Sequence, residues 1–170
     1  MRQKKVLKST AIVLGIVVAI AGGYVYWQYR TSRPVDLGSI PAYTDGVPVT
    51  DIVEPQRSDA ERQLRDLAST AQPGYHLVAE RFLSTNVQFT FDALRHDVER
   101  FLGPDGYYLD RDGWSSDHMS YYSSYRHHGW LRQRFNDDRI VVTDLAKTSL
   151  PTASGGSVHL YGYFRLATSA

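Results

Sequence analysis

The aromatic and ionisable side chains best suited to recognition or catalysis lie in one stretch, residues 105–130. Seven aromatic residues stand there among three histidines and several serines and aspartates. Aromatic rings with a polar edge bury a large area and keep a hydrogen-bonding tip, which suits contacts with proteins and sugars. The stretch therefore indicates either a recognition surface for a partner protein or glycan, or Tyr-rich strands and loops covering a small core. The candidate surface comprises Tyr107, Tyr108, Trp114, Tyr121, Tyr122, Tyr125 and Trp130.

The ionisable residues of this region match no familiar catalytic or metal-binding spacing. Asp110 to Gly113 looks like part of a calcium loop, but the EF-hand register places Tyr108 and Met119 where carboxylates are required. The histidines show no HExxH spacing, and no GxSxG, Ser-x-x-Lys or phosphate-loop pattern occurs. Adjacent histidines also point to different faces of a regular element, so one ion cannot easily use both. We therefore expect no catalytic residue, no metal site and no cofactor, and hence a protein that is not an enzyme; the histidines in question are His118, His127, His128 and His159.

Composition excludes further classes of binding and chemistry. The net charge of +1 gives no electrostatic reason to expect a nucleic-acid partner. Cysteine is absent, which excludes disulfides, thiol chemistry and cysteine-based metal sites. With 170 residues the chain has room for one domain of ordinary size.

The elements that position these residues begin with an apolar segment. Thr10 to Trp27 contains no charged residue, and these eighteen residues would span about 27 Å as a helix, close to the thickness of a bilayer core. Four basic residues precede the segment and two follow it, which predicts a cytoplasmic N-terminus and an extracytoplasmic remainder. We therefore expect a basic cytoplasmic end over 1–9 and a transmembrane helix over 10–29. An aromatic belt marks the outer interface: Tyr24, Tyr26, Trp27 and Tyr29.

Two features of the apolar segment bear on its role. Ala19-Ile20-Ala21 has the small-x-small form of a signal-peptide cleavage site, so a cleaved leader is the alternative to a retained anchor. The apolar residues nevertheless continue past Ala21 to Val25, which favours the anchor. Small residues also recur at successive i, i+4 positions, which would let two transmembrane helices approach closely. This predicted packing ridge consists of Ala11, Gly15, Ala19 and Gly23.

Helical signals follow an extended, proline-marked linker over 30–57. Ser58 to Glu61 has the form of a capping box, and the apolar stripe after it predicts a helix that ends at Pro73-Gly74. Leu77–Leu83 is interpreted as a second short helix. Apolar residues at helical spacing predict a further helix over 91–102, with Thr90 or Asp92 as its cap and Gly103-Pro104 as its end.

The last third of the chain is typical of β structure. Arg139 to Leu145 reads as a strand, and Val158 to Thr168 alternates between two faces. Together these segments predict an antiparallel pair against which the helices pack. The expected fold is therefore α+β: one N-terminal transmembrane helix, then a small extracytoplasmic domain over 58–170 with two or three helices packed on an antiparallel sheet.

Three short runs carry a resemblance to a known family. They are Ala42-Tyr43-Thr44-Asp45-Gly46-Val47-Pro48, then Glu54-Pro55 with Ser58 leading into a helix, and Phe89-Thr90-Phe91-Asp92. In these runs the chain resembles the IcmL/DotI group of inner-membrane components of type IV secretion systems, relatives of the VirB-type assembly subunit. The resemblance implies one anchor, a small periplasmic NTF2-like domain and no catalytic residues.

These observations favour a non-enzymatic bitopic protein of the cell inner membrane, acting as a structural or interaction subunit of an envelope-spanning assembly such as a secretion or conjugation system. The partners expected are membrane lipid and other membrane or envelope proteins, including a second copy of the chain. One alternative is an anchored binding module for glycan or peptidoglycan that uses the aromatic surface. Another is an anchored immunity or inhibitor protein.

Overall fold

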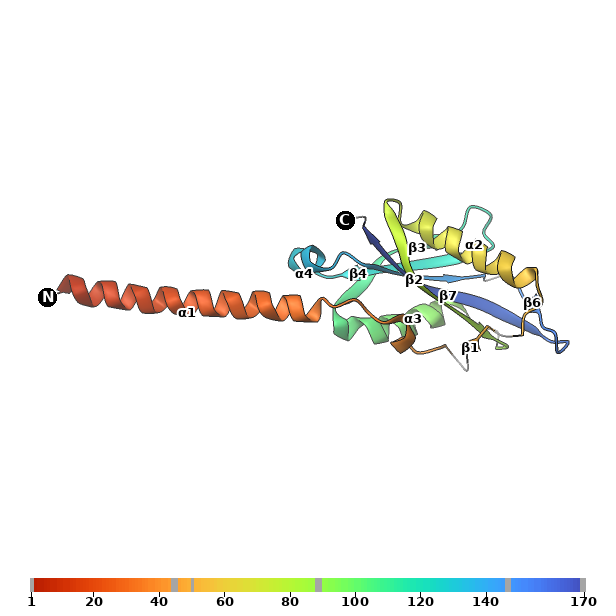
Figure 1. Ribbon diagram of the computed structural model, residues 1–170, viewed down its shortest axis with the longest axis horizontal. Coiled ribbons are helices and arrows are strands. Elements are labelled where there is room, and N and C mark those ends of the chain that lie inside the picture. Colours follow the sequence, from red (N-terminus) through yellow and green to blue (C-terminus); the bar gives the residue numbers. More distant parts are fainter. Residues whose placement is uncertain (1, 44–45, 50, 88–89, 146–147, 169–170) are drawn as a thin grey trace.

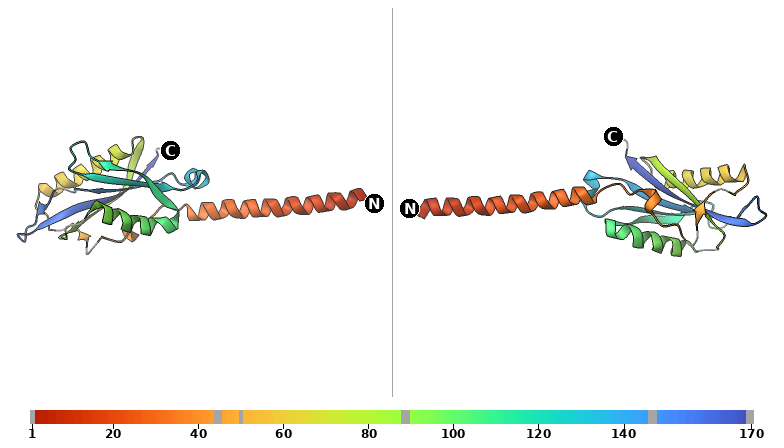
Figure 2. Two further views of the ribbon diagram at one scale, coloured as in Figure 1. Left: turned by 180° about the vertical axis from the view of Figure 1, so that it is seen from behind. Right: turned by 60° about the horizontal axis from the view of Figure 1, so that its bottom comes forward.

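The computed structural model describes residues 2–43, 46–49, 51–87, 90–145 and 148–168. Within them the fold is α+β, with four α-helices and a seven-stranded antiparallel sheet. The first helix projects from the folded part as a long rod (Figure 1), and two further views show the same arrangement (Figure 2). The α+β prediction is confirmed at this level.

The rod is α1 (Arg2–Thr31), and its apolar part is exposed along most of its length. Ile12–Thr31 is long and apolar enough to cross a membrane, and a signal sequence near the N-terminus would meet the same criterion. With bounds at Arg2 and Thr31, α1 extends beyond the predicted helix over 10–29 in both directions. Gly15, Ala19 and Gly23 lie on its exposed surface, whereas the side chain of Ala11 lies outside the described part.

The sheet has the strand order β1-β2-β7-β5-β4-β3, and β6 pairs with β7 beside this path. All of its pairings are antiparallel. One edge strand has only two residues, and the other carries a bulge between Leu109 and Arg111 with charged residues around it, two devices that discourage edge-to-edge association. The strands are β1 (Val47–Pro48), β2 (Tyr75–Thr85), β3 (Tyr107–Trp114), β4 (Tyr121–His127), β5 (Arg139–Asp144), β6 (Leu150–Pro151) and β7 (Ser157–Thr168).

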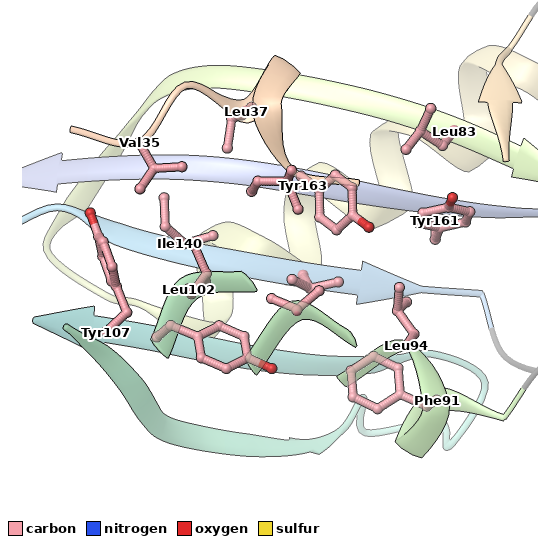
Figure 3. Packing of buried hydrophobic residues seen from close by; sticks show 14 residues of the cluster. Val35, Leu37, Leu83, Phe91, Leu94, Leu102, Tyr107, Ile140, Tyr161 and Tyr163 are labelled. Carbon is pink, nitrogen blue, oxygen red and sulfur yellow. The ribbon is translucent and has the colours of Figure 1, made fainter. Parts of the chain in front are cut away.

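Both faces of the sheet are covered, by different segments. Helix α2 (Gln56–Ala71) lies over one face and α3 (Phe91–Leu102) over the other (Figure 1). The α2 face buries Leu64 with Phe164, and the α3 face buries Leu94 with Tyr163. In Figure 3 Val35 and Leu37, which precede β1, lie over the strand that carries Tyr163. The central strands are therefore apolar on both sides, which explains the unbroken Ile140-Val141-Val142 run of β5.

Residues 77–83 do not form the short helix expected from the sequence; they belong to β2. This strand pairs with β7 from Tyr75–Thr168 to Thr85–His159. The partner strand is the last element of the described chain, so the hydrogen bonds that fix residues 77–83 as a strand come from a segment remote in sequence. Tertiary pairing of this kind overrides local propensity.

The two other predicted helices are present, but only one has the predicted cap. In α3 the Thr90 side chain accepts a hydrogen bond from the Ala93 amide, as expected. The predicted capping box of α2 is wrong, because the helix already begins at Gln56, after Pro55. The Ser58 hydroxyl instead donates a 2.6 Å hydrogen bond to Glu54, and Glu61 pairs with Arg57 at 2.9 Å.

The predicted antiparallel pair of C-terminal strands is confirmed, since Arg139–Asp144 pairs with Leu166–Tyr161 along β5 and β7. Within residues 30–57, the segment expected as a linker, the described part contains the end of α1, the short 3-10 helix η1 (Leu37–Ser39), β1 and the start of α2. Val35, Leu37 and Ile40 from this segment are buried in the core on the α3 face.

Candidate functional site: the neck between the apolar helix and the sheet

The segment that follows α1 is fastened to the sheet through its backbone. In β2, Nη1 of Arg81 donates hydrogen bonds to the carbonyl oxygens of Leu37 at 2.9 Å and Ile40 at 2.6 Å. In β7, Nη1 of Arg165 donates to the carbonyl oxygen of Val35 at 3.3 Å. Side chains from two adjacent strands therefore satisfy carbonyl groups that burial would otherwise leave unpaired.

Two tyrosines of β7 continue this attachment toward β1. The Tyr163 hydroxyl donates to the carbonyl oxygen of Pro41 at 3.1 Å, and the Tyr161 hydroxyl accepts from the amide of Tyr43 at 3.0 Å. The chain passes so close at Gly46 that a Cβ atom there would stand 2.1 Å from the Tyr161 hydroxyl oxygen. Both tyrosines are buried, and burial raises the pKa of Tyr161 to about 12. They therefore stay uncharged and act as hydrogen-bonding groups over the physiological pH range.

The end of α1 itself contacts α4 (Trp130–Phe135). Nε of Arg132 donates a 2.8 Å hydrogen bond to Oε1 of Gln28, and the guanidinium carbon stands 5.3 Å from the centroid of the Trp27 ring. The rings of Tyr29 and Phe135 meet edge to face at 5.4 Å. The two helices therefore share polar, cation–π and aromatic contacts.

A glycine makes room for the arginine of this contact. Gly106 has a φ of +81°, which favours glycine, and a Cβ atom there would lie 1.4 Å from Nη1 of Arg132. The same nitrogen donates to the carbonyl oxygen of Asp105 at 3.1 Å. We call residues 27–43 together with α4 the neck. It joins α1 to the sheet at several independent points.

The residues of the predicted aromatic belt lie together on α1, whereas those of the predicted aromatic surface lie in different parts of the fold. Tyr24, Tyr26, Trp27 and Tyr29 are all exposed on α1, two of them against α4. The seven residues of the candidate surface fall into separate groups. Tyr125 and Tyr107 are only 0% and 5% exposed and contribute to the core. Trp130 belongs to the neck, half-buried Tyr108 lies under Arg126, and Trp114, Tyr121 and Tyr122 flank the β3–β4 turn.

The turn between β3 and β4 lies at the end of the sheet away from α1 and α4 (Figure 1). Trp114 is 44% exposed there, its ring stands edge to face with Tyr121 at 5.0 Å, and Met119 is also exposed. Between this turn and α2 lies a hollow of about 510 Å³. Its lining includes Leu67, Thr70, Trp114, Asp117 and Tyr122. We call Trp114, Met119 and Tyr122 with this hollow the distal patch.

The carboxylates of the Asp110–Gly113 run are engaged in ion pairs. Asp110 pairs with Arg126 at 2.9 Å and Asp112 with Arg95 at 2.7 Å, and the Tyr121 hydroxyl also donates to Asp112 at 2.9 Å. Among the residues that the structure describes, no three His, Asp or Glu side chains are grouped so that they could hold a metal ion.

Two buried ionisable groups lie far apart on β4 and β5. His127 is fully buried, stacks on Tyr107 with 3.9 Å between centroids, and has its pKa lowered to about 4 by desolvation, with nearby arginines adding to the effect. Asp144 is 2% exposed, and desolvation raises its pKa to about 7. Asp144 pairs with Tyr121, six residues from His127 along β4, or about 20 Å at strand spacing. The two groups therefore cannot act together on one substrate.

The sequence analysis did not identify the three arginines that form hydrogen bonds to residues of the neck. Arg81 and Arg165 occupy inward positions of strands, and Arg132 lies in a short helix, but each bonds to residues 41 to 130 positions away. Arg165 stands between two apolar residues, but Arg81 and Arg132 have polar neighbours and carry no local signal. Comparisons with protein-family models, curated proteins and solved structures found no match to the chain. Of the runs that prompted the family resemblance, Thr44, Asp45 and Phe89 lie outside the described residues.

Proposed function

We propose that this chain is a non-enzymatic bitopic membrane protein that carries its α+β domain in a fixed orientation on a single anchor, as a structural subunit of an envelope-spanning assembly. In this proposal α1 crosses the inner membrane with its basic start in the cytoplasm and the domain lies outside. The family resemblance to IcmL/DotI proteins is consistent with such a role.

The neck is the observation that carries the proposal. A domain that is only tethered needs no more than a flexible linker, because a Gly/Ser-rich or extended chain gives free movement. Here the chain after α1 is instead bonded to two strands of the sheet, and α1 itself is bonded to α4. Fixing a domain relative to its anchor is useful where other subunits must meet it at a set height and angle.

The distal patch is the part of the predicted aromatic surface best placed to bind another subunit. An eight-residue strand separates it from the α4 end of the neck, which corresponds to about 25 Å. Its exposed Trp114 and Met119 are residue types enriched at protein interfaces. Glycan stacking over the whole predicted set is less favoured, because Trp114 lies at the turn of the β3–β4 hairpin, Trp130 follows its open end, and Tyr125 between them is buried.

The small-residue ridge of α1 offers a second contact, to another transmembrane helix. A Cβ atom added at Gly15 or Gly23 would meet nothing within 4 Å. The first atom of a larger side chain at these positions therefore meets no clash in the isolated chain. Any effect of such side chains would report a helix that packs against the ridge.

The proposal is tested in two steps with the full-length chain. C-terminal fusions establish topology: alkaline phosphatase should be active and green fluorescent protein dark, and the reverse result would contradict the proposal. Purification in mild detergent should then yield a complex of defined stoichiometry that is weakened by Gly15→Leu with Gly23→Leu, or by Trp114→Ala. Val17→Leu, about 200° around the helix from Gly15, is the matched control. A monomer indifferent to all these changes would refute the assembly role.

A further inference from the structure

A second element lies beside the aromatic belt of α1. Helix α4 reads Trp130-Leu131-Arg132-Gln133-Arg134-Phe135. Its Trp130 side chain is 76% exposed, more than any other large hydrophobic residue that the structure describes. Phe135 at the other end of the helix is exposed as well. This short helix therefore presents an exposed indole at one end and, at the other, a partly exposed phenyl ring that packs on Tyr29, a surface suited to an apolar or amphipathic partner.

The contacts of α4 set its height along α1. Arg132 is bonded to Gln28 and lies against Trp27, and Phe135 meets Tyr29. Trp130 shares a hollow of about 470 Å³ with Tyr24, one helical turn before Gln28. In both views of Figure 2 α4 lies beside the end of α1. The exposed rings of Trp130 and Phe135 are therefore at the same height along α1 as the belt residues 24–29.

The chemistry of this level fits a lipid headgroup region. Trp and Tyr concentrate at membrane–water interfaces, where the ring contacts acyl chains and the polar edge stays hydrated. Arginines beside them extend into the headgroups. Exposed basic side chains lie on the same elements: Arg30 near the end of α1, Arg33 just after it and Arg134 in α4.

We propose that α4 is a second membrane contact, in which Trp130 and Phe135 enter the headgroup region of the leaflet where α1 emerges. The inference rests on the proposed function, because it requires α1 to cross a bilayer. With both contacts the domain would be held at two points of the surface, so that it could not rotate freely about the axis of α1. The continuity of α4 with the belt favours lipid over a protein as the occupant.

The test uses full-length chains that retain one tryptophan each, with the other two replaced by Phe, reconstituted into phosphatidylcholine–phosphatidylglycerol vesicles. The chain contains three tryptophans, so three variants cover it: Trp27 alone, Trp130 alone and Trp114 alone. Lipids brominated near the headgroup end of the acyl chain quench only tryptophans at the interface. We expect the fraction of quenched emission to be similar for the Trp27-only and Trp130-only chains, and emission from Trp114 to be unaffected.

The controls separate this inference from the proposed function. If the Trp27-only chain is quenched and the Trp130-only chain is not, the inference about α4 is wrong but the membrane placement stands. Helix α4 would then be a contact for protein. Loss of quenching at both tryptophans would overturn the membrane placement itself. Quenching of all three would mean that the domain lies flat on the lipid, which also contradicts contact through α4.

Discussion

Arg132 and Gln28 are bonded across 104 residues of sequence, with Nε of the arginine 2.8 Å from Oε1 of the glutamine. Gln28 is buried although it lies in the exposed helix α1. This bond places the end of the apolar helix against the folded domain. Several consequences of the neck can be measured.

Replacing Arg132 with Ala should destabilise the domain by about 2 kcal/mol, because it removes two hydrogen bonds and a cation–π contact together. Thermal or urea unfolding of the full chain in detergent measures the change. Arg134→Ala is the matched control: it removes an exposed arginine from the same helix and should alter the free energy of unfolding by less than about 0.5 kcal/mol. Equal effects of the two variants would argue against the described neck.

Gly106→Ala should destabilise the protein more than Gly74→Ala. Both glycines have a positive φ, +81° and +87°, so each change adds about 1 kcal/mol of backbone strain. Only at Gly106 does the new methyl group collide with Arg132. A double-mutant cycle isolates this collision: in the Arg132→Ala background the extra cost of Gly106→Ala should vanish. Strict additivity would mean that the arginine does not occupy this space.

Tyr163→Phe should cost about 1 kcal/mol, since it removes the hydrogen bond to the Pro41 carbonyl and leaves that oxygen without this donor. The loss should also speed hydrogen exchange of nearby amides such as Ile40, because the segment would open more often. Tyr122→Phe removes a half-buried hydroxyl from the distal patch and serves as the control. Unchanged exchange near residue 40 in Tyr163→Phe would contradict the attachment.

The buried groups His127 and Asp144 should oppose each other in the pH dependence of stability. The folded-state pKa of His127, about 4, lies below its ordinary 6.5, so its unfolded form takes up the proton first and stability falls as pH drops from about 6.5 to 4. The folded-state pKa of Asp144, about 7, lies above its ordinary 3.8, so stability falls as pH rises from about 4 to 7. The two slopes, each on the order of 1 kcal/mol per pH unit, largely cancel in the unaltered chain.

Single variants should expose each slope. Relative to the unaltered chain, Asp144→Asn should become more stable as pH rises from 4 to 7, and His127→Phe should become less stable over the same interval. Urea unfolding at a series of pH values measures both. If both variants shift the curve in the same direction, the assigned pKa directions are wrong.

Parts of this fold follow from local patterns. The helical conformation of the apolar run in α1, the Thr90 cap of α3 and the alternation along β7 each depend on residues that are neighbours in sequence, and these three features are confirmed. Residues 77–83 were misassigned because the hydrogen bonds that make them a strand come from β7, about eighty positions later. The capping box failed for a related reason, since Glu54 lies before the motif and takes the Ser58 hydroxyl.

The sequence predicted the positions of the candidate site residues less well than it predicted the fold. The predicted aromatic surface was one stretch of sequence, but strand alternation sends Tyr125 into the core and Tyr122 to the opposite face of β4. Trp114 and Trp130 are only sixteen residues apart, yet a hairpin carries them to opposite ends of the sheet. The neck itself depends on single arginines whose partners are fixed by the tertiary fold.

The central claim is that the domain is mounted rigidly on α1, and the most direct measurement is the distance distribution between two spin labels in full-length protein in lipid nanodiscs. The chain has no cysteine, so Tyr26→Cys on α1 and Ser116→Cys at the β3–β4 turn give a single labelled pair. Both positions are exposed. We expect one narrow distribution that broadens when Arg132→Ala is added. A broad distribution in the otherwise unaltered chain would contradict a fixed mounting.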